Sequence, residues 1–128
     1  GSMIVAFRNG KAARFSMESF ETKTNRRRLT GAYSDKSPAV GFFFPVDDET
    51  EITMFSTANR ALTFRAGMLD IKATRSTQGV QTMVLRGKHT VTRACLTAEA
   101  NLLDEARYRF RSIPSIGALL TEDQLKFE

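Results

Sequence analysis

Three adjacent arginines occupy a stretch of the sequence that has too few apolar residues to form a hydrophobic core. Arg26, Arg27 and Arg28 lie within residues 24–38, TNRRRLTGAYSDKSP, which is rich in Thr, Asn, Gly, Ser, Asp and Pro. A guanidinium group is always charged and offers a planar fork of donors that fits phosphate oxygens, while Thr and Asn add neutral donors. The pattern is typical of a loop that contacts phosphates without reading bases.

The positive charge of the chain is concentrated toward its N-terminal half. Residues 1–46 carry eight Lys/Arg against three Asp/Glu, residues 47–95 seven against five, and residues 96–128 four against six, so the blocks have net charges of +5, +2 and −2. This asymmetry favours a polyanionic partner for the N-terminal half. We expect Lys11 and Arg14 to extend the basic surface.

Residues that could support catalysis or bind a metal ion are few. The single histidine, His89, and the single cysteine, Cys95, lack a convincing third partner, so they form neither a metal site nor an activated nucleophile. We interpret Cys95 as a small hydrophobic residue of a strand. The acidic run Asp47, Asp48, Glu49 and Glu51 has no EF-hand spacing and is interpreted as a turn. We predict a non-enzymatic chain without metal or cofactor.

Short apolar segments separated by turn residues predict a mainly β fold. Residues 3–7 and 12–15 flank an Asn-Gly turn and predict a hairpin. Residues 40–44 and 51–56 predict a second hairpin around the acidic turn, with Phe42, Phe43 and Phe44 in the core. Further strands are expected at 60–65, and at 79–85 and 90–96 on either side of a turn at Gly87.

The C-terminal part of the sequence has a different pattern. Residues 98–107 predict a short helix capped by Thr97, with Leu102, Leu103 and Ala106 facing inward. Residues 108–111 alternate aromatic and basic side chains, which predicts a strand ending before Pro114 in which Arg109 and Arg111 have structural roles. Residues 116–120 are expected to pack back on the body.

The predicted strands repeat along the chain. Residues 4–28 align with residues 52–76 at an offset of 48 to 49, with Phe7 over Phe55, the Asn-Gly turn over Ala58-Asn59, and Phe15 over Phe64. A repeat of this length points to propellers or arrays. We assign residues 1–3 to an expression scar, 4–51 and 52–96 to two blade-like repeats, and 97–128 to a tail packing on the blades.

The ordered succession of these segments resembles a known family. The Asn-Gly hairpin, SMESFETKTNRRR, AYSDKSPAVGFFF, the acidic turn and NRALTFRAGMLDIKATRSTQGVQTMVL are similar to the C-terminal β-pinwheel domain of the A subunit of DNA gyrase and topoisomerase IV. The resemblance covers about residues 4–96 and implies about two four-stranded antiparallel blades of a longer subunit. The heptapeptide Gln-Arg-Arg-Gly-Gly-Lys-Gly, which gyrase uses for tight positive wrapping, does not occur here.

The resemblance implies a non-catalytic module that binds and wraps double-stranded DNA within an ATP-dependent type II topoisomerase. Its other partners would be the rest of the A subunit and the B subunit. Phosphate contacts are expected from the two basic segments, namely Lys23, Thr24, Asn25, Arg26, Arg27, Arg28, Lys36, Lys72, Thr74 and Arg75.

Two alternatives concern the partner and the isolated fragment. A β-rich interaction module that binds an acidic protein surface or RNA would use the same basic loop. Two blades separated from a ring would expose apolar flanks and strand edges, which favours self-association. The sequence has no run of about 18 apolar residues, which a membrane span needs, and no secretion signal, so a cytoplasmic location is expected.

Overall fold

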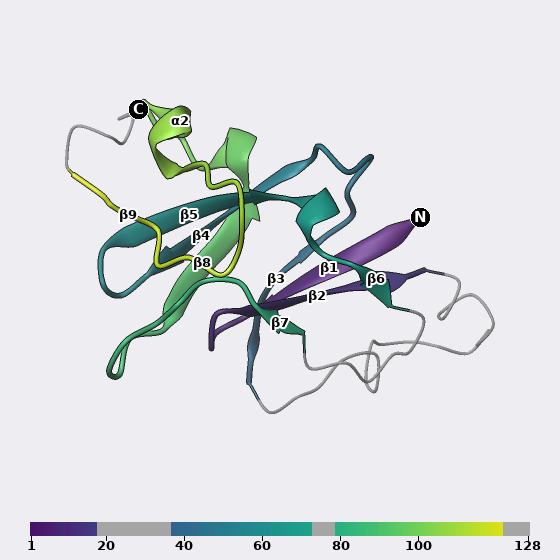
Figure 1. Cartoon of the computed structure of the whole chain (residues 1–128), viewed down its shortest axis with the longest axis horizontal. Helices are drawn as coiled ribbons and strands as arrows, with labels where there is room; N and C mark the ends of the chain where they lie inside the picture. The colour runs from purple at the N-terminus through teal and green to yellow at the C-terminus, as the bar shows by residue number, and fades with distance from the viewer. Residues whose placement is uncertain (18–36, 73–78, 122–128) are drawn as a thin grey trace.

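The computed structural model describes residues 1–17, 37–72 and 79–121, and these form two sheets. Sheet 1 consists of β1 (Ser2–Phe7), β2 (Lys11–Ser16), β3 (Ala39–Phe43), β6 (Ile71–Lys72) and β7 (Val80–Gln81). Sheet 2 consists of β4 (Glu51–Ser56), β5 (Arg60–Arg65), β8 (Val91–Leu96) and β9 (Ala118–Leu119). The mainly β, mostly antiparallel prediction is confirmed (Figure 1).

The strand order of each sheet departs from the chain order. Sheet 1 runs β3-β1-β2-β6, with β7 also on β2, and sheet 2 runs β8-β4-β5-β9. Strand β6 pairs with β2 in parallel and β7 pairs with it antiparallel. Sheet 1 is therefore completed by two strands that follow β5 in the sequence and lie within the range expected for the second repeat.

The expected second hairpin is wrong. Strand β3 pairs with β1, whereas β4 pairs with β5 and β8, so the 40–44 and 51–56 segments belong to different sheets. The 47–50 turn, closed by Thr50 N donating to Asp47 O at 3.3 Å, carries the chain from one sheet to the other. The strands on either side of Gly87 separate in the same way, because β7 pairs with β2 and β8 with β4.

The internal repeat is visible in the strand registers. Ser2 pairs with Ser16 in the first hairpin and Glu51 with Arg65 in the second, an offset of 49. The register of β1 shifts after Ala6 and that of β4 shifts after Phe55, which are also 49 residues apart. Phe7 is therefore the counterpart of Ser56 and not of Phe55. A one-residue slip moves a side chain to the opposite face of a sheet, so the predicted Phe7–Phe55 equivalence is wrong, whereas Phe15–Phe64 is right.

The central core lies between the two sheets. Ile4, Ala6, Ala12 and Phe43 of sheet 1 belong to one buried cluster with Ile52, Met54, Leu62 and Phe64 of sheet 2. Alternate residues face the other side of each strand, and those of β1 and β2 form a second cluster around Met3, Val5 and Phe15. Of the predicted aromatic core only Phe43 is buried, since Phe42 and Phe44 are 43% and 63% exposed.

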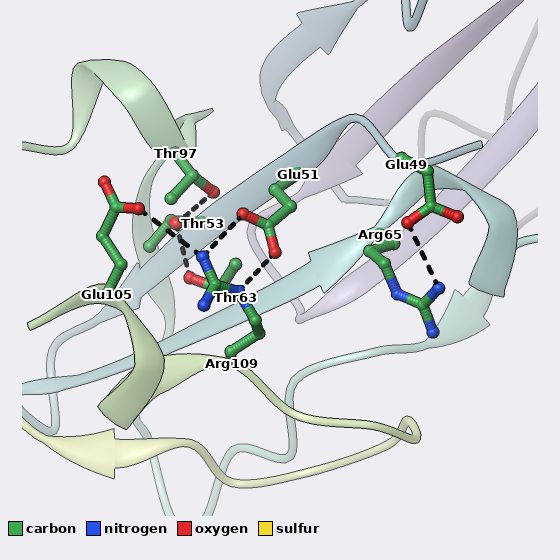
Figure 2. Close-up of polar contacts among 8 residues, drawn as sticks. All are labelled: Glu49, Glu51, Thr53, Thr63, Arg65, Thr97, Glu105 and Arg109. Carbon is green, nitrogen blue, oxygen red and sulfur yellow. Dashed lines mark hydrogen bonds and ion pairs between the residues drawn. The ribbon is translucent and has the colours of Figure 1, made fainter. Parts of the chain in front are cut away.

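The tail covers the outer face of sheet 2. Phe55, Ala61 and Cys95 of that sheet form a third cluster with Ala100, Leu102 and Tyr108. Thr53 Oγ1 of β4 lies 2.7 Å from Thr63 Oγ1 of β5 and 2.9 Å from Thr97 Oγ1 at the start of the tail, as drawn in Figure 2, so the second contact joins the sheet to the tail. The predicted return of residues 116–120 to the body is confirmed, because β9 pairs with β5.

The predicted helix and strand of the tail are only partly right. A 3-10 turn, η2 (Thr97–Glu99), and a short helix, α2 (Glu105–Tyr108), replace the single helix. The Thr97 side chain caps neither, because it bonds to Thr53 instead. Leu102 is buried as predicted, but Leu103 and Ala106 are exposed. The expected strand 108–111 is reduced to one parallel bridge between Arg109 and Thr63.

Candidate nucleic-acid interface

Lys72 is the only predicted phosphate-contacting residue within the described part of the chain. It ends β6, where it pairs with Phe15 of β2, and its side chain is exposed. The other predicted contacts lie outside the described residues, namely Lys23, Thr24, Asn25, Arg26, Arg27, Arg28, Lys36, Thr74 and Arg75.

The described residues that flank the two predicted basic segments lie close to β2. Met17, which precedes the first segment, is two residues beyond Phe15. Phe15 is the register partner of Lys72, the first residue of the second segment. Ser37, which follows the first segment, accepts a hydrogen bond from Asn9 N at its Oγ, at 3.1 Å. Gly79, which follows the second, lies against Ala12. Both segments therefore leave and rejoin the described fold beside the β1–β2 hairpin.

Arg14 does not extend the basic surface, contrary to the sequence-based expectation. Its residue surface is 6% exposed, and its guanidinium group donates to Ser2 Oγ at 2.8 Å, to Ala66 O at 3.0 Å and to Asp48 Oδ1 at 3.0 Å. These partners come from β1, from the 3-10 turn η1 (Ala66–Met68) and from the acidic turn. Arg14 thus ties sheet 1 to the acidic turn and to η1, and its burial keeps the guanidinium group from contacting a phosphate on the surface.

The other charges near the acidic turn are also paired. Arg109 contacts Glu51 through two nitrogens, with Nη2 at 3.0 Å from Oε1, and reaches Glu105 at 3.5 Å, as Figure 2 shows. The hydrogen bond to Glu51 raises the pKa of Arg109 above its usual value, so the guanidinium stays charged. Arg65 reaches Glu49 at 3.6 Å. We call this region, with Asp47–Glu51, Glu105, Arg14, Arg65 and Arg109, the acidic end.

The opposite end of the strands carries basic residues that sequence reasoning missed. Arg8 follows β1, and Arg86 and Lys88 lie in the loop before β8; all three are exposed. The turn after β1, the turn after β4 and this loop gather on the lower left side of the molecule in Figure 1. Among residues 1–17, 37–72 and 79–121, no carboxylate pairs with any of the three. We call Arg8, Arg86 and Lys88 the basic turn surface.

His89 and Cys95 have separate environments. His89 is exposed and its Nδ1 lies 2.8 Å from Thr57 Oγ1. Cys95 is 7% exposed and packs in the cluster beneath the tail, which confirms its interpretation as a small hydrophobic residue. Burial raises the pKa of the Cys95 thiol, Glu99 raises it further, and Arg93 opposes both. Within the described ranges no group of three His, Cys, Asp or Glu side chains could hold a metal ion, and no helix could span a membrane.

Comparison with solved structures identifies the fold. The C-terminal domain of DNA topoisomerase IV superposes with a TM-score of 0.74 at 13% identity, over 97% of this chain and 43% of that one. The DNA gyrase A C-terminal domain gives a TM-score of 0.68 at 17% identity, over 91% and 42%. The E. coli ParC C-terminal domain gives 0.56 at 13% identity, over 79% and 41%.

These likenesses show that the chain has the fold of these β-pinwheel domains and spans about two fifths of their length. No protein-family model and no curated protein matches the sequence.

Proposed function

We propose that this chain is a non-catalytic module that binds duplex DNA through its phosphate backbone. The observation that supports this most is the arrangement at β2, where two basic segments leave and rejoin the fold beside one hairpin, with exposed Lys72 at the start of one of them. Such an arrangement would let cations and neutral donors of both segments reach one stretch of DNA backbone. Because phosphate contacts carry no base information, the binding would tolerate any sequence.

The shared fold supports a more specific role. As part of a bacterial type II topoisomerase A subunit, of gyrase or topoisomerase IV, the module would hold and wrap DNA while other domains of the A subunit and the B subunit carry out the ATP-dependent reaction. The location would then be cytoplasmic. Self-association of the fragment stays a prediction, which sedimentation at increasing concentration tests.

Removing the three arginines tests the proposal. Each phosphate contact contributes about 0.9 to the slope of log affinity against log salt, so Arg26→Ala, Arg27→Ala and Arg28→Ala together should flatten the slope by roughly 2 to 3. Fluorescence anisotropy with two unrelated duplexes should show equal weakening for both. Circular dichroism and the melting temperature should match those of the parent chain, since only Leu29 among the nearby loop residues is a large apolar residue.

Other outcomes would contradict the proposal. If the parent chain binds duplex DNA without salt dependence, or binds only an acidic protein or single-stranded RNA, the alternative of an interaction module is favoured. If the triple variant keeps the affinity and the salt slope of the parent chain, the arginines are solvated surface residues.

A further inference from the structure

We propose that the basic turn surface of Arg8, Arg86 and Lys88 is a second phosphate-contact site, over which the backbone of duplex DNA passes from one sheet to the other. The inference rests on the proposed function and adds a site on residues outside the predicted basic segments. Its first support is spatial. Val91 N donates to Arg8 O at 2.9 Å, which joins the end of β1 in sheet 1 to the start of β8 in sheet 2.

The loop that carries Arg86 and Lys88 is held in place by its neighbours. Thr57 N donates to Thr90 O at 2.8 Å, Thr90 N donates to Thr57 Oγ1 at 3.1 Å, and the same hydroxyl meets His89 Nδ1. Gly87 has φ of 62°, and a Cβ there would find no heavy atom within 4 Å. Hydrogen bonds thus hold the base of the loop, while its tip at Gly87 is open to solvent. Because the base is already fixed, its backbone loses little conformational freedom when a ligand binds.

The segments that carry this surface have charges of one sign. Residues 1–17, 52–69 and 79–98 contain Arg or Lys but no Asp or Glu. The carboxylates of the 47–51 turn bind Arg14, Arg65 and Arg109 at the acidic end. None of Arg8, Arg86 and Lys88 is paired with a carboxylate among the described residues, so a polyanion has no ion pair to displace there, and the release of counterions from its phosphates favours binding.

The repeat places a matching cation in each unit. Arg8 N donates to Pro38 O at 2.9 Å as Thr57 N donates to Thr90 O, which makes Pro38 and Thr90 counterparts. Lys36 precedes Pro38 by two residues, and Lys88 precedes Thr90 by two. Lys88 is therefore the counterpart, in the second unit, of a lysine already predicted to contact phosphate. Repeated cations suit a ligand with regularly spaced charges, as in a DNA backbone, better than a compact anion.

The test compares two double variants of the full 128-residue chain. Arg86→Gln with Lys88→Gln removes two charges from the basic turn surface, and Arg107→Gln with Arg111→Gln removes two exposed charges from the tail. At about 0.1 M salt each phosphate contact is worth about eightfold in affinity, so the first variant should bind a duplex about 60-fold more weakly, with a slope lower by about 1.8. The tail variant should change the slope by less than about 0.5, because Arg107 and Arg111 lie in the tail, outside the basic turn surface.

The outcomes separate this inference from the proposed function. If the parent chain does not bind duplex DNA, both fail. If it binds and the Arg26–Arg28 variant weakens binding while the Arg86/Lys88 variant does not, only this inference is overturned. Equal losses in the two double variants would indicate bulk charge and overturn it too, as would a loss seen with a single-stranded RNA but not with the duplex. Melting temperatures within about 2 °C of the parent exclude misfolding, as surface changes typically alter stability by under about 0.5 kcal/mol.

Discussion

At the acidic end the guanidinium groups of Arg14, Arg65 and Arg109 each meet a carboxylate, whereas at the basic turn surface Arg8, Arg86 and Lys88 meet none within the described ranges. The same residue types thus have two roles in one small fold. Paired charges hold turn and tail against the sheets. Unpaired charges keep their donors available for a ligand. The difference indicates that a basic residue is assigned to binding by its partners rather than by its type.

The largest effect on stability is expected from Arg14→Leu. This change removes three hydrogen bonds of a buried guanidinium group, to Ser2, Asp48 and Ala66, so we expect a loss of about 2–3 kcal/mol in the free energy of unfolding. The melting temperature should fall by roughly 10 °C. Arg8→Leu is the matched control and should leave it nearly unchanged. If Arg14→Leu lowers the salt slope of DNA binding but does not lower the melting temperature, Arg14 contacts DNA and its structural role is wrong.

Lys72→Gln tests whether Lys72, at the edge of sheet 1, contacts DNA as the basic turn surface is proposed to do. Lys72 is exposed at the end of β6, so its loss should leave the melting temperature unchanged. If it contacts one phosphate, affinity for duplex DNA should fall about eightfold at about 0.1 M salt, and the slope should decrease by about 0.9. Anisotropy titrations at several salt concentrations measure both. No change in either quantity would place Lys72 among solvated residues.

A smaller effect is expected from Arg109→Gln. The Arg109 side chain is 43% exposed and its partner Glu51 22%, so solvent screening limits the two ion pairs to about 0.5–1 kcal/mol of stability. The melting temperature should fall by about 2–5 °C, with no loss of DNA affinity. Glu105→Gln, which removes only the longer contact, should have less effect. If Arg109→Gln lowers the affinity for DNA as much as Lys72→Gln does, the acidic end also contributes to binding and the proposed difference between the two ends is wrong.

The smallest expected effect is a change in the reactivity of the Cys95 thiol, which lies beneath the tail. Burial and a raised pKa both reduce the thiolate available for reaction, so iodoacetamide should modify the folded chain far more slowly than the unfolded one near neutral pH. The rate should rise as the pH increases toward the raised pKa. Arg109→Gln, which loosens the tail, should accelerate the reaction modestly, whereas Arg86→Gln should not. Fast modification of the parent chain would show that the tail does not seal this face.

Local patterns predicted the parts of the fold that depend on neighbours in sequence. The Asn-Gly turn and the alternation around it were enough for the β1–β2 hairpin, and the alignment at an offset of 48 to 49 placed the Ala58-Asn59 turn between the segments that form β4 and β5. The partners of β3 and β7 depend instead on which strand edges are free after the chain has folded back. No local pattern carries that information, so the wrong hairpin prediction arose where the chain changes sheet.

The candidate site shows the same limit. Arg14 stands in a strand beside Phe15, and nothing nearby in the sequence shows that Asp48 and Ala66 will surround it. The basic turn surface joins residues almost eighty positions apart. One signal was available, since Lys36-Ser37-Pro38 and Lys88-His89-Thr90 both precede a strand, but their offset of 52 differs from the 48 to 49 of the hairpins. An alignment at one fixed offset therefore does not show that Lys36 and Lys88 occupy matching positions.

The sharing of strands between units also bears on how the chain is made. During synthesis β1, β2 and β3 emerge first, yet β6 and β7, which cover the free edge of β2, emerge only after the β4–β5 hairpin. The edge of β2 in sheet 1 therefore stays unpaired until residues 71–81 have left the ribosome. By then the β4–β5 hairpin of sheet 2 has also emerged, so sheet 1 is completed together with sheet 2. A chain released after residue 51 would lack these two strands, the β4–β5 hairpin and the far side of the central core. We therefore expect the two units to melt in one cooperative transition and not as independent folding domains.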